Sequence, residues 1–222
     1  MAPTPRTTFR RLPERGHHDR ATVDAILDEA LVCHLGLVDP EGRPFVIPTI
    51  HARSGDHLYV HGSPASRTLR AAAGDVDACV TVTLVDGLVL ARSAFHHSLN
   101  YRSVVVYGRA AKVTDPDEKE AALTAIVEHV LAGRTEGCRP PDEKELKGTL
   151  VLRLPLDEAS AKVRTGAPID DDADLDLPVW AGVVPIRQVA GEPVPDGGVT
   201  APWPGYDLGR PVSRPGSPRS SG

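Results

Sequence analysis

Aromatic side chains are scarce in this sequence, which holds 3 Phe, 4 Tyr and 2 Trp among 222 residues. Hydrophobic residues nevertheless make up 41% of the chain, so the sequence predicts a core built mainly from Val, Leu, Ile and Ala. Val recurs in alternating or continuous runs, which favours strands. No apolar run is long enough to span a bilayer, and the basic N-terminus lacks the apolar stretch of a signal peptide. We therefore expect no membrane partner.

Cysteine is also rare. Cys33, Cys79 and Cys138 are widely spaced and form no CxxC pair, so they indicate neither a zinc site nor a disulfide framework. Cys33 and Cys79 lie inside apolar runs, where a free cysteine behaves as a small core residue. Because reduced thiols are typical of the cytosol, we expect a soluble, cytoplasmic protein.

An excess of positive charge is missing as well. The formal net charge is -5 at pH 7. A protein that binds nucleic acid needs a basic face to neutralise phosphates. We therefore expect no nucleic-acid partner.

Capping residues and apolar spacing predict two main helices. Asp19 is a suitable N-cap for the first, and Asp115 followed by Pro116 and acidic residues opens the second. A shorter helix is predicted over residues 69–73, after a possible N-cap at Ser63. The apolar positions are Val23, Ile26, Leu27 and Ala30 in the first helix, and Leu123, Ile126, Val127, Val130 and Leu131 in the second.

The remaining regular structure is predicted to be β. Residues 77–90 alternate Val and Thr around Asp86-Gly87, which is a hairpin signature. Neighbouring strands joined by short turns give an antiparallel sheet too large to stay open, so it should close as a barrel. Regular βαβ alternation and a GxGxxG motif are missing, which argues against a Rossmann fold. The other strands are predicted at residues 31–38, 45–52, 57–61, 103–113, 149–154 and 160–164, with a last candidate at 183–189.

Composition divides the chain into three parts. Residues 1–18 are polar and rich in Pro and Arg, which indicates an N-terminal arm. Residues 19–190 carry the helix and strand patterns of one domain. Residues 191–222 are dominated by Pro, Gly and Ser, which indicates a tail.

A first candidate site follows the third predicted strand. A helix N-terminus there would present free backbone N–H groups and a positive dipole end. Gly permits close approach, Ser hydroxyls add donors, and Arg adds a bidentate cation, so together they predict a phosphate cradle. The alternative is an ordinary capped helix with a surface Arg. The segment reads His61-Gly62-Ser63-Pro64-Ala65-Ser66-Arg67.

A second candidate site spans residues 92–103, where hydrogen-bonding side chains join two apolar strands. His, Asn, Tyr, Arg and Ser offer a flat polar ligand both stacking surfaces and directional donors. The alternative is a solvated loop. Metal binding by His96 and His97 is disfavoured, because neighbouring strand side chains point to opposite faces and no Cys or carboxylate follows at ligand spacing.

Three further features are weaker. Lys162 and Arg164 alternate onto one strand face that could attract an anion, although a solvated face is the simpler interpretation for Lys162. Trp180 is interpreted as a core plug or a dimer-interface residue. The acidic run at residues 170–174 lacks the spacing and the Gly of a calcium loop, so it is interpreted as a solvated loop.

Taken in order, three segments resemble the pyridoxamine 5'-phosphate oxidase-like family, in its branch of flavin-nucleotide-binding and nitroimidazole-reductase-like proteins. They are Phe45-Val46-Ile47-Pro48-Thr49, then residues 61–67, then residues 97–108, which read His-Ser-Leu-Asn-Tyr-Arg-Ser-Val-Val-Val-Tyr-Gly. The resemblance covers about residues 11–189. It implies an antiparallel six-stranded split β-barrel with flanking helices, a bound FMN, and a homodimer with FMN at the subunit interface.

The resemblance also implies residue roles. The strand with Val46, Ile47, Pro48 and Thr49 would lie along the flavin ring. Ser66 and Arg67 would hold the FMN phosphate. The cradle argument adds Ser63 as a phosphate ligand, and His61 and Gly62 are predicted to bind the cofactor in the same segment. Arg102 and Ser103 would approach the cofactor. We expect Thr49, Asn100, Arg102 and Ser103 to bond ring or ribityl groups, with Tyr101 also at the cofactor. By position and side-chain inventory alone, His97 or Tyr101 is a candidate proton donor.

The tail departs from the family's oxidase, because residues 191–197 offer no Arg and His pair to grip a substrate phosphate. We therefore expect an FMN-dependent oxidoreductase acting on an unidentified small organic substrate, rather than on pyridoxamine phosphate. The alternatives are a non-catalytic flavin binder, a haem-binding or haem-degrading barrel with His61, His96 or His97 as iron ligand, and a protein that uses a deazaflavin coenzyme.

Overall fold

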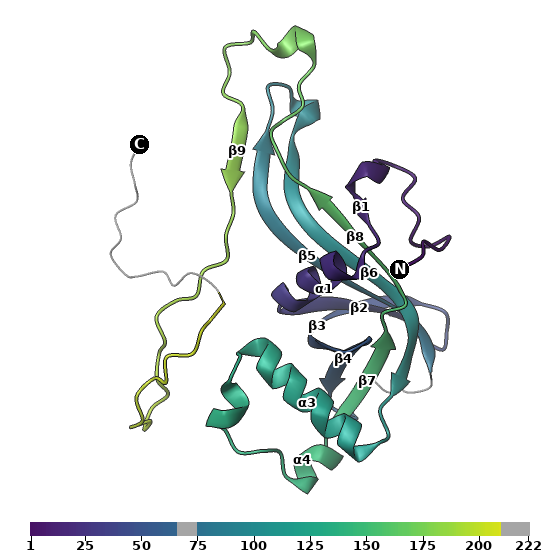
Figure 1. Ribbon diagram of the computed structural model, residues 1–222, viewed down its shortest axis with the longest axis vertical. Coiled ribbons are helices and arrows are strands. Elements are labelled where there is room, and N and C mark those ends of the chain that lie inside the picture. The colour runs from purple at the N-terminus through teal and green to yellow at the C-terminus, as the bar shows by residue number, and fades with distance from the viewer. Residues whose placement is uncertain (66–74, 210–222) are drawn as a thin grey trace.

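The computed structural model describes residues 1–65 and 75–209. Its strands form one antiparallel sheet, from which a long ribbon made by two of them extends upward (Figure 1). The strands are β1 (Gly16–His17), β2 (Val32–Val38), β3 (Pro44–Ser54), β4 (His57–Gly62), β5 (Val76–Leu90), β6 (Ser98–Lys112), β7 (Leu150–Pro155), β8 (Glu158–Arg164) and β9 (Gly182–Pro185). The α-helices are α1 (Arg20–Glu29), α3 (Pro116–Val130) and α4 (Glu143–Lys147), with short 3-10 turns at Pro13–Arg15, Ala94–His96, Arg134–Gly137 and Asp172–Asp174.

Six of these strands close into a ring. The strand order is β1-β8-β6-β7-β4-β3-β2-β5-β9, and β5 also pairs with β6. The ring therefore runs β6-β7-β4-β3-β2-β5, while β1, β8 and β9 lie outside it. This confirms the predicted six-stranded antiparallel split barrel and its opening meander, because β2, β3 and β4 pair in sequence.

The ring is split between β3 and β4. These strands pair only from His51 to Ser54 of β3. Residues 44–50 of β3 pair with β2 on one side, and on the other side they have no strand partner among the residues that the structure describes. Their backbone N–H and C=O groups on that side are free to bind something other than a strand.

The predicted hairpin at Asp86-Gly87 is wrong, because β5 is one continuous strand of 15 residues. A β-bulge stands there instead, with a register shift between Val85 and Gly87. A Cβ added at Gly87 would lie 3.0 Å from Val183 Cγ1 and 3.2 Å from the Val184 carbonyl oxygen. The glycine thus permits the close approach of β9. Because β5 continues to Leu90, the chain turns only after it, and β6 begins at Ser98, inside the segment predicted to be a loop.

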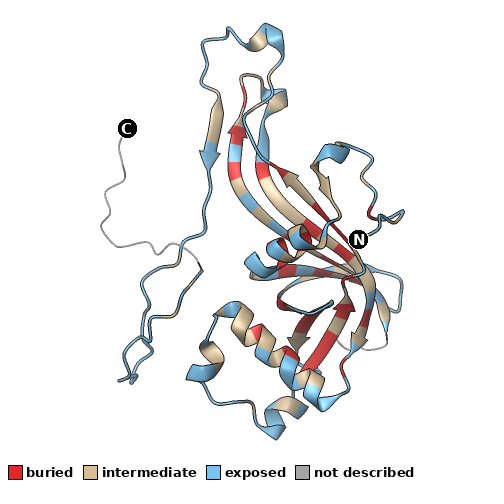
Figure 2. Ribbon diagram, in the orientation of Figure 1, coloured by how far each residue is buried: buried red, intermediate tan, exposed pale blue. Residues whose placement is uncertain are grey.

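Two apolar cores hold the ring and its helices (Figure 2). Val23, Ile26 and Leu27 of α1 are buried against the inward side chains of the strands, as the sequence predicts. The Asp19 carboxylate caps this helix by accepting a hydrogen bond from the Thr22 backbone N–H at 2.8 Å. The second core lies under α3, whose Ala122 and Ile126 pack with Ala52, Tyr59, Val113 and Val151.

One surface of the ring is apolar and exposed. Alternation along β2 and β3 turns Cys33 and Leu35 into the core and turns Val32, Val46 and Ile50 outward. We call the outward surface formed by Val32, Val38, Val46, Pro48 and Ile50 the open face. Its Val32, Val38, Val46 and Ile50 are 46%, 54%, 63% and 37% exposed.

Two terminal segments of the described structure contact the rest of the molecule. The N-terminal residues pack beside β8, where Arg6 forms an ion pair with Glu158. After β9 the chain continues along the outside of the molecule (Figure 1); we call residues 186–209 the C-terminal strap. The Arg134 guanidinium donates to the Tyr206 hydroxyl at 3.2 Å and so fastens the strap. Trp180 is 66% exposed, so its prediction as a core plug is wrong.

No helix within residues 1–65 and 75–209 is long and apolar enough to span a bilayer. The helix predicted over residues 69–73 lies outside the described residues. The division into arm, domain and tail remains a proposal.

Candidate functional site

The first candidate residues lie along the split edge of β3. Val46 and Pro48 point outward on the open face, whereas Ile47 packs against the core and Thr49 follows the same inward alternation. The two exposed side chains offer a flat apolar support beside the unpaired backbone of residues 44–50. A planar ligand with polar edges fits such a surface, because it can bury its ring and bond the free backbone groups.

The end of β4 lies next to this edge. His51 pairs with Val60, so continuing the register brings Ile50 level with His61. His61 Nδ1 is buried and has no hydrogen-bond partner in the described structure, and burial lowers the pKa of this imidazole. An orphaned buried polar atom indicates room for a ligand group that would satisfy it. Ser63 Oγ accepts a hydrogen bond from the Ala65 N–H at 3.1 Å; Ser66 and Arg67, the predicted phosphate ligands, lie outside the described residues.

The residues predicted from β6 lie on another part of the sheet. Ser103 pairs with Thr83 of β5, and Val32 pairs with Ile50 of β3. Continuing the β2–β5 register brings Thr83 level with Val32. Ser103 is therefore three strands from Ile50, or about 14 Å at the usual strand spacing. One copy of the chain does not bring the two sets of predicted residues into contact.

Arg102 is held by two carboxylates. Its guanidinium donates to Asp86 at 2.7 and 2.9 Å and to Glu29 at 2.8 Å, and these hydrogen bonds raise its pKa. Strand alternation turns Tyr101 and Ser103 to the other side of β6. Arg102 thus joins α1, β5 and β6, and its bonding capacity is largely used within the chain.

The other candidates on this strand lie nearer its beginning. His97 Nδ1 donates to the Ser93 carbonyl oxygen at 2.9 Å. The Asn100 amide donates to the Gly166 carbonyl oxygen at 3.1 Å and accepts from the guanidinium of Arg164. His97 is six residues from Ser103, or roughly 20 Å along an extended strand. The structure therefore separates His97 from the β3 edge.

Arg164 is 5% exposed rather than on a solvated face. It donates to the carbonyl oxygens of Gly166 and Ala167 at 3.4 and 3.2 Å. Burial and the nearby Arg15 charge lower its pKa. Its role is to tie the chain after β8 to β6.

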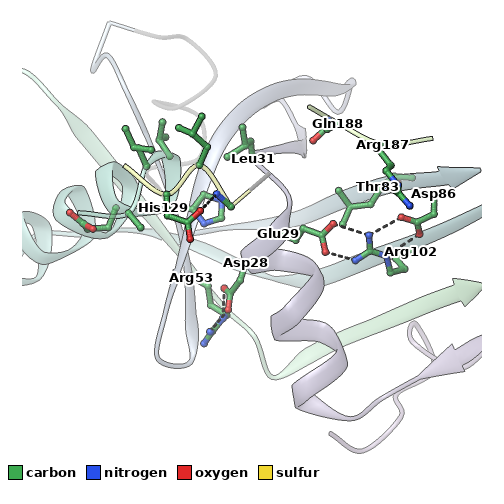
Figure 3. A pocket seen from close by; sticks show the side chains of 18 of the residues that line it. Asp28, Glu29, Leu31, Arg53, Thr83, Asp86, Arg102, His129, Arg187 and Gln188 are labelled. Atoms are coloured by element: carbon green, nitrogen blue, oxygen red, sulfur yellow. Dashed lines mark hydrogen bonds and ion pairs between the residues drawn. The ribbon is translucent and has the colours of Figure 1, made fainter. Parts of the chain in front are cut away.

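A large cavity, which the sequence did not predict, opens beside the ring (Figure 3). Its volume is about 870 Å³. The ends of α1 and α3, part of β5, Arg102 and the C-terminal strap form its walls. These segments are far apart in the sequence, so no local pattern could have indicated it. Arg102 and Asp86 stand on one side and His129 on the other (Figure 3).

Two histidines join α1 to its neighbours near this cavity. His51 Nε2 lies 3.0 Å from the Leu27 carbonyl oxygen, and His129 Nε2 lies 2.8 Å from that of Ala30. A carbonyl only accepts, so both Nε2 atoms carry a hydrogen. The ring centroids are 4.8 Å apart, and burial lowers the pKa of His51 to about 4. Helical periodicity could have indicated that His129 faces inward, because it follows the buried Ile126 by three residues.

The described part of the chain holds no group of three or more His, Cys, Asp or Glu side chains arranged for a metal ion.

Comparison with known proteins agrees with this geometry. The family model described as pyridoxamine 5'-phosphate oxidase matches residues 19–163. The solved structure of the flavocytochrome Anf3 from Azotobacter vinelandii is 42% identical, covers 96% of this chain and 99% of its own, and superposes with a TM-score of 0.87. The FAD and haem binding protein from Mycobacterium smegmatis is 37% identical, covers 86% of this chain and 94% of its own, with a TM-score of 0.82. Among curated proteins none matches.

Proposed function

Because the chain belongs to the pyridoxamine 5'-phosphate oxidase family of flavin-binding split barrels, we propose that it is a flavin-dependent oxidoreductase acting on a small organic substrate. The split edge of β3 carries this proposal. It combines exposed apolar side chains, unpaired backbone groups and the orphaned Nδ1 of His61. Fold alone does not name the substrate, which depends on the residues at the site.

The chain's own residues bind and orient the flavin. Val46 and Pro48 support one face of the ring, and the backbone of residues 44–50 bonds its polar edge. His61 Nδ1 accepts a hydrogen bond from a ring or ribityl group. Ser63 and, by resemblance, Ser66 and Arg67 hold the phosphate. A bound flavin supplies the electron transfer that no side chain can perform.

The β6 residues enter the site from a second copy of the chain. Tyr101 and Ser103 are too far from the β3 edge to share its flavin within one copy. The open face supports a homodimer, since contiguous exposed apolar side chains are typical of an interaction surface. In the dimer, Tyr101 of one copy is the candidate proton donor at the flavin of the other, and His97 is the second candidate. Light scattering on the purified protein measures the oligomeric state.

The flavin is FMN or FAD. The sequence predicts FMN, whereas the Mycobacterium smegmatis relative is named for FAD. Visible absorption of the purified protein, followed by chromatography of the released chromophore, identifies it. A colourless protein that takes up neither FMN nor FAD contradicts the proposal.

Arg67 tests the phosphate cradle. We expect Arg67→Ala to lower flavin affinity by about tenfold or more, because a charge-assisted bidentate contact to phosphate is lost. Arg43→Ala is the control, since Arg43 is exposed in the β2–β3 turn and, among the described residues, forms ion pairs with Asp39 and Glu41 alone. Equal flavin occupancy in both variants would remove Arg67 from the site.

A haem is the second cofactor to consider. Both relatives described above are named for it, one as a flavocytochrome and one as a FAD and haem binding protein. The similarity covers 96% of this chain for Anf3 and 86% for the Mycobacterium smegmatis protein, which is more than the family model matches. We therefore include haem binding beside the flavin in the proposed function, and a Soret band on haem titration tests it.

A further inference from the structure

Two cations of β8 share a face of the sheet with the flavin candidates of β6. Lys162 pairs with Ser103, and Arg164 pairs with Tyr101, in the antiparallel register of these strands. Directly opposite residues of an antiparallel pair point to the same side of the sheet. Val163, which lies between the two cations, packs against the core. The four polar side chains therefore point to the outer side.

Neither cation forms an ion pair within the part of the chain that the structure describes. The Lys162 ammonium donates to the Arg11 carbonyl oxygen at 3.3 Å and lies 5.8 Å from the centroid of the Phe9 ring. Arg164 is 5% exposed, and its hydrogen bonds go to the amide oxygen of Asn100 and to backbone carbonyl oxygens. A buried charge normally has a partner of opposite sign, because its removal from water is costly. The two side chains thus leave an unneutralised positive charge on this face.

The chain before β1 adds positive charge to the same edge of the sheet. Arg10 and Arg11 are exposed there, and Arg15 is close enough to Arg164 to lower its pKa. Glu14 opposes them, 3.8 Å from the Arg15 guanidinium. Because the whole chain has a formal net charge of -5, this edge is a local exception. It is suited to a ligand group that carries negative charge.

The row of paired residues that contains Lys162 continues across the open face. In the registers of the sheet, Lys162 is level with Ser103, Thr83, Val32 and Ile50 on successive strands. Lys162 is therefore four strands from Ile50, or about 19 Å, which is too far to contact a flavin at the β3 edge of its own copy. A second copy that brings Ser103 to this edge brings Lys162 with it, since the two residues are directly opposite on adjacent strands.

We propose that Lys162 contacts the flavin bound by the partner copy and stabilises the negative charge of the reduced ring. The inference rests on the proposed function and its homodimer, and it adds a residue to that site. Addition of a hydride from an organic donor to the neutral ring brings two electrons and one proton and leaves one negative charge. A cation at the polar edge of the ring stabilises this charge. Arg164 adds to the same positive potential from its fixed position in the sheet.

The consequence is a difference in affinity between the two oxidation states of the flavin. The oxidised ring is uncharged and gains little from the ammonium, whereas the reduced ring gains an ion-pair interaction in a site that the partner covers. The midpoint potential of the bound flavin rises with the ratio of the two affinities, and a tenfold ratio equals about 30 mV for two electrons. A residue that only positions the flavin changes both affinities equally and leaves the potential unchanged.

The test is the midpoint potential of the flavin in the full-length protein, loaded with FMN or FAD, whichever it retains. The potential is measured by reductive titration with dithionite against an indicator dye. Lys162→Met keeps an unbranched side chain and removes its charge, so we expect about a tenfold smaller preference for reduced flavin and a potential lower by about 30 mV. Lys162→Arg keeps the charge and should keep most of the wild-type potential.

Lys112→Met is the control, because Lys112 is exposed on β6, nine residues from Ser103 or roughly 30 Å along the strand. An unchanged potential in Lys162→Met, or an equal fall in Lys112→Met or Lys162→Arg, overturns the assignment.

Loss of flavin from Lys162→Met during purification is met by a second measurement. The affinities of the apoprotein for the oxidised and for the dithionite-reduced flavin are then compared by titration. A loss about tenfold larger for the reduced form supports the assignment, and equal losses for both forms overturn it. A wild type that binds flavin without these differences in the variants refutes this inference alone, whereas one that takes up neither FMN nor FAD refutes the proposed function.

Discussion

Replacing His51 by Gln should remove a large part of the acid sensitivity of the fold. His51 is completely buried under α1, and burial lowers its pKa from 6.5 to about 4. Between these two values the unfolded chain binds a proton that the folded chain does not, so the free energy of unfolding falls as the pH falls through this window. From about pH 7.5 to about pH 5 this single group costs about 2 kcal/mol by the linkage relation.

Urea denaturation at the two pH values measures this cost. Gln keeps an N–H for the Leu27 carbonyl oxygen but does not titrate, so His51→Gln should lose about 2 kcal/mol less than the wild type on acidification. His61, whose pKa is also lowered by burial, acts in the same direction in both proteins and cancels in the comparison. His57→Gln is the matched control, because His57 lies at the β3–β4 turn, away from the open face. An equal loss of stability in the wild type and in His51→Gln would refute the argument.

Two further substitutions test the roles assigned above. Val32→Asp places a charge on the open face and should shift the protein from dimer to monomer with loss of flavin, as light scattering and absorption would show. Val130→Asp, at an equal 46% exposure on α3, should change neither the oligomeric state nor the flavin content. A dimeric Val32→Asp would contradict the proposed interface. Arg102→Met leaves Glu29 and Asp86 facing each other and should cost about 1 kcal/mol in urea denaturation, discounted because Glu29 is half exposed. Retained flavin in this folded variant would mark Arg102 as structural, whereas loss of flavin without loss of stability would return it to the cofactor site.

The elements that sequence predicted well are those with local causes. Asp19 and Asp115 cap their helices through hydrogen bonds to backbone N–H groups within three residues. The first three strands are bounded by turns such as the one at Gly42, whose φ of 81° favours glycine. These signals depend on a few neighbouring residues, so the sequence is sufficient to find them.

The failures have non-local causes. Asp86-Gly87 satisfies the hairpin rule, yet its conformation is set by β9, about a hundred residues later in the sequence. The polar segment at residues 92–103 resembles a loop, yet pairing with β5 and β8 makes its second half, from Ser98 on, a strand. The cavity requires α1, α3, β5 and the strap at once. No window of sequence contains the information that brings these segments together.

The position of Thr83 connects the cavity to the open face. Thr83 lines the cavity and is also level with Val32 on the open face and with Ser103 on β6. The cavity therefore borders the surface where a second copy should bind, and a partner covering Val32 also restricts the cavity mouth. Binding at one site then alters the solvent exposure of the other, which couples them energetically without a conformational change.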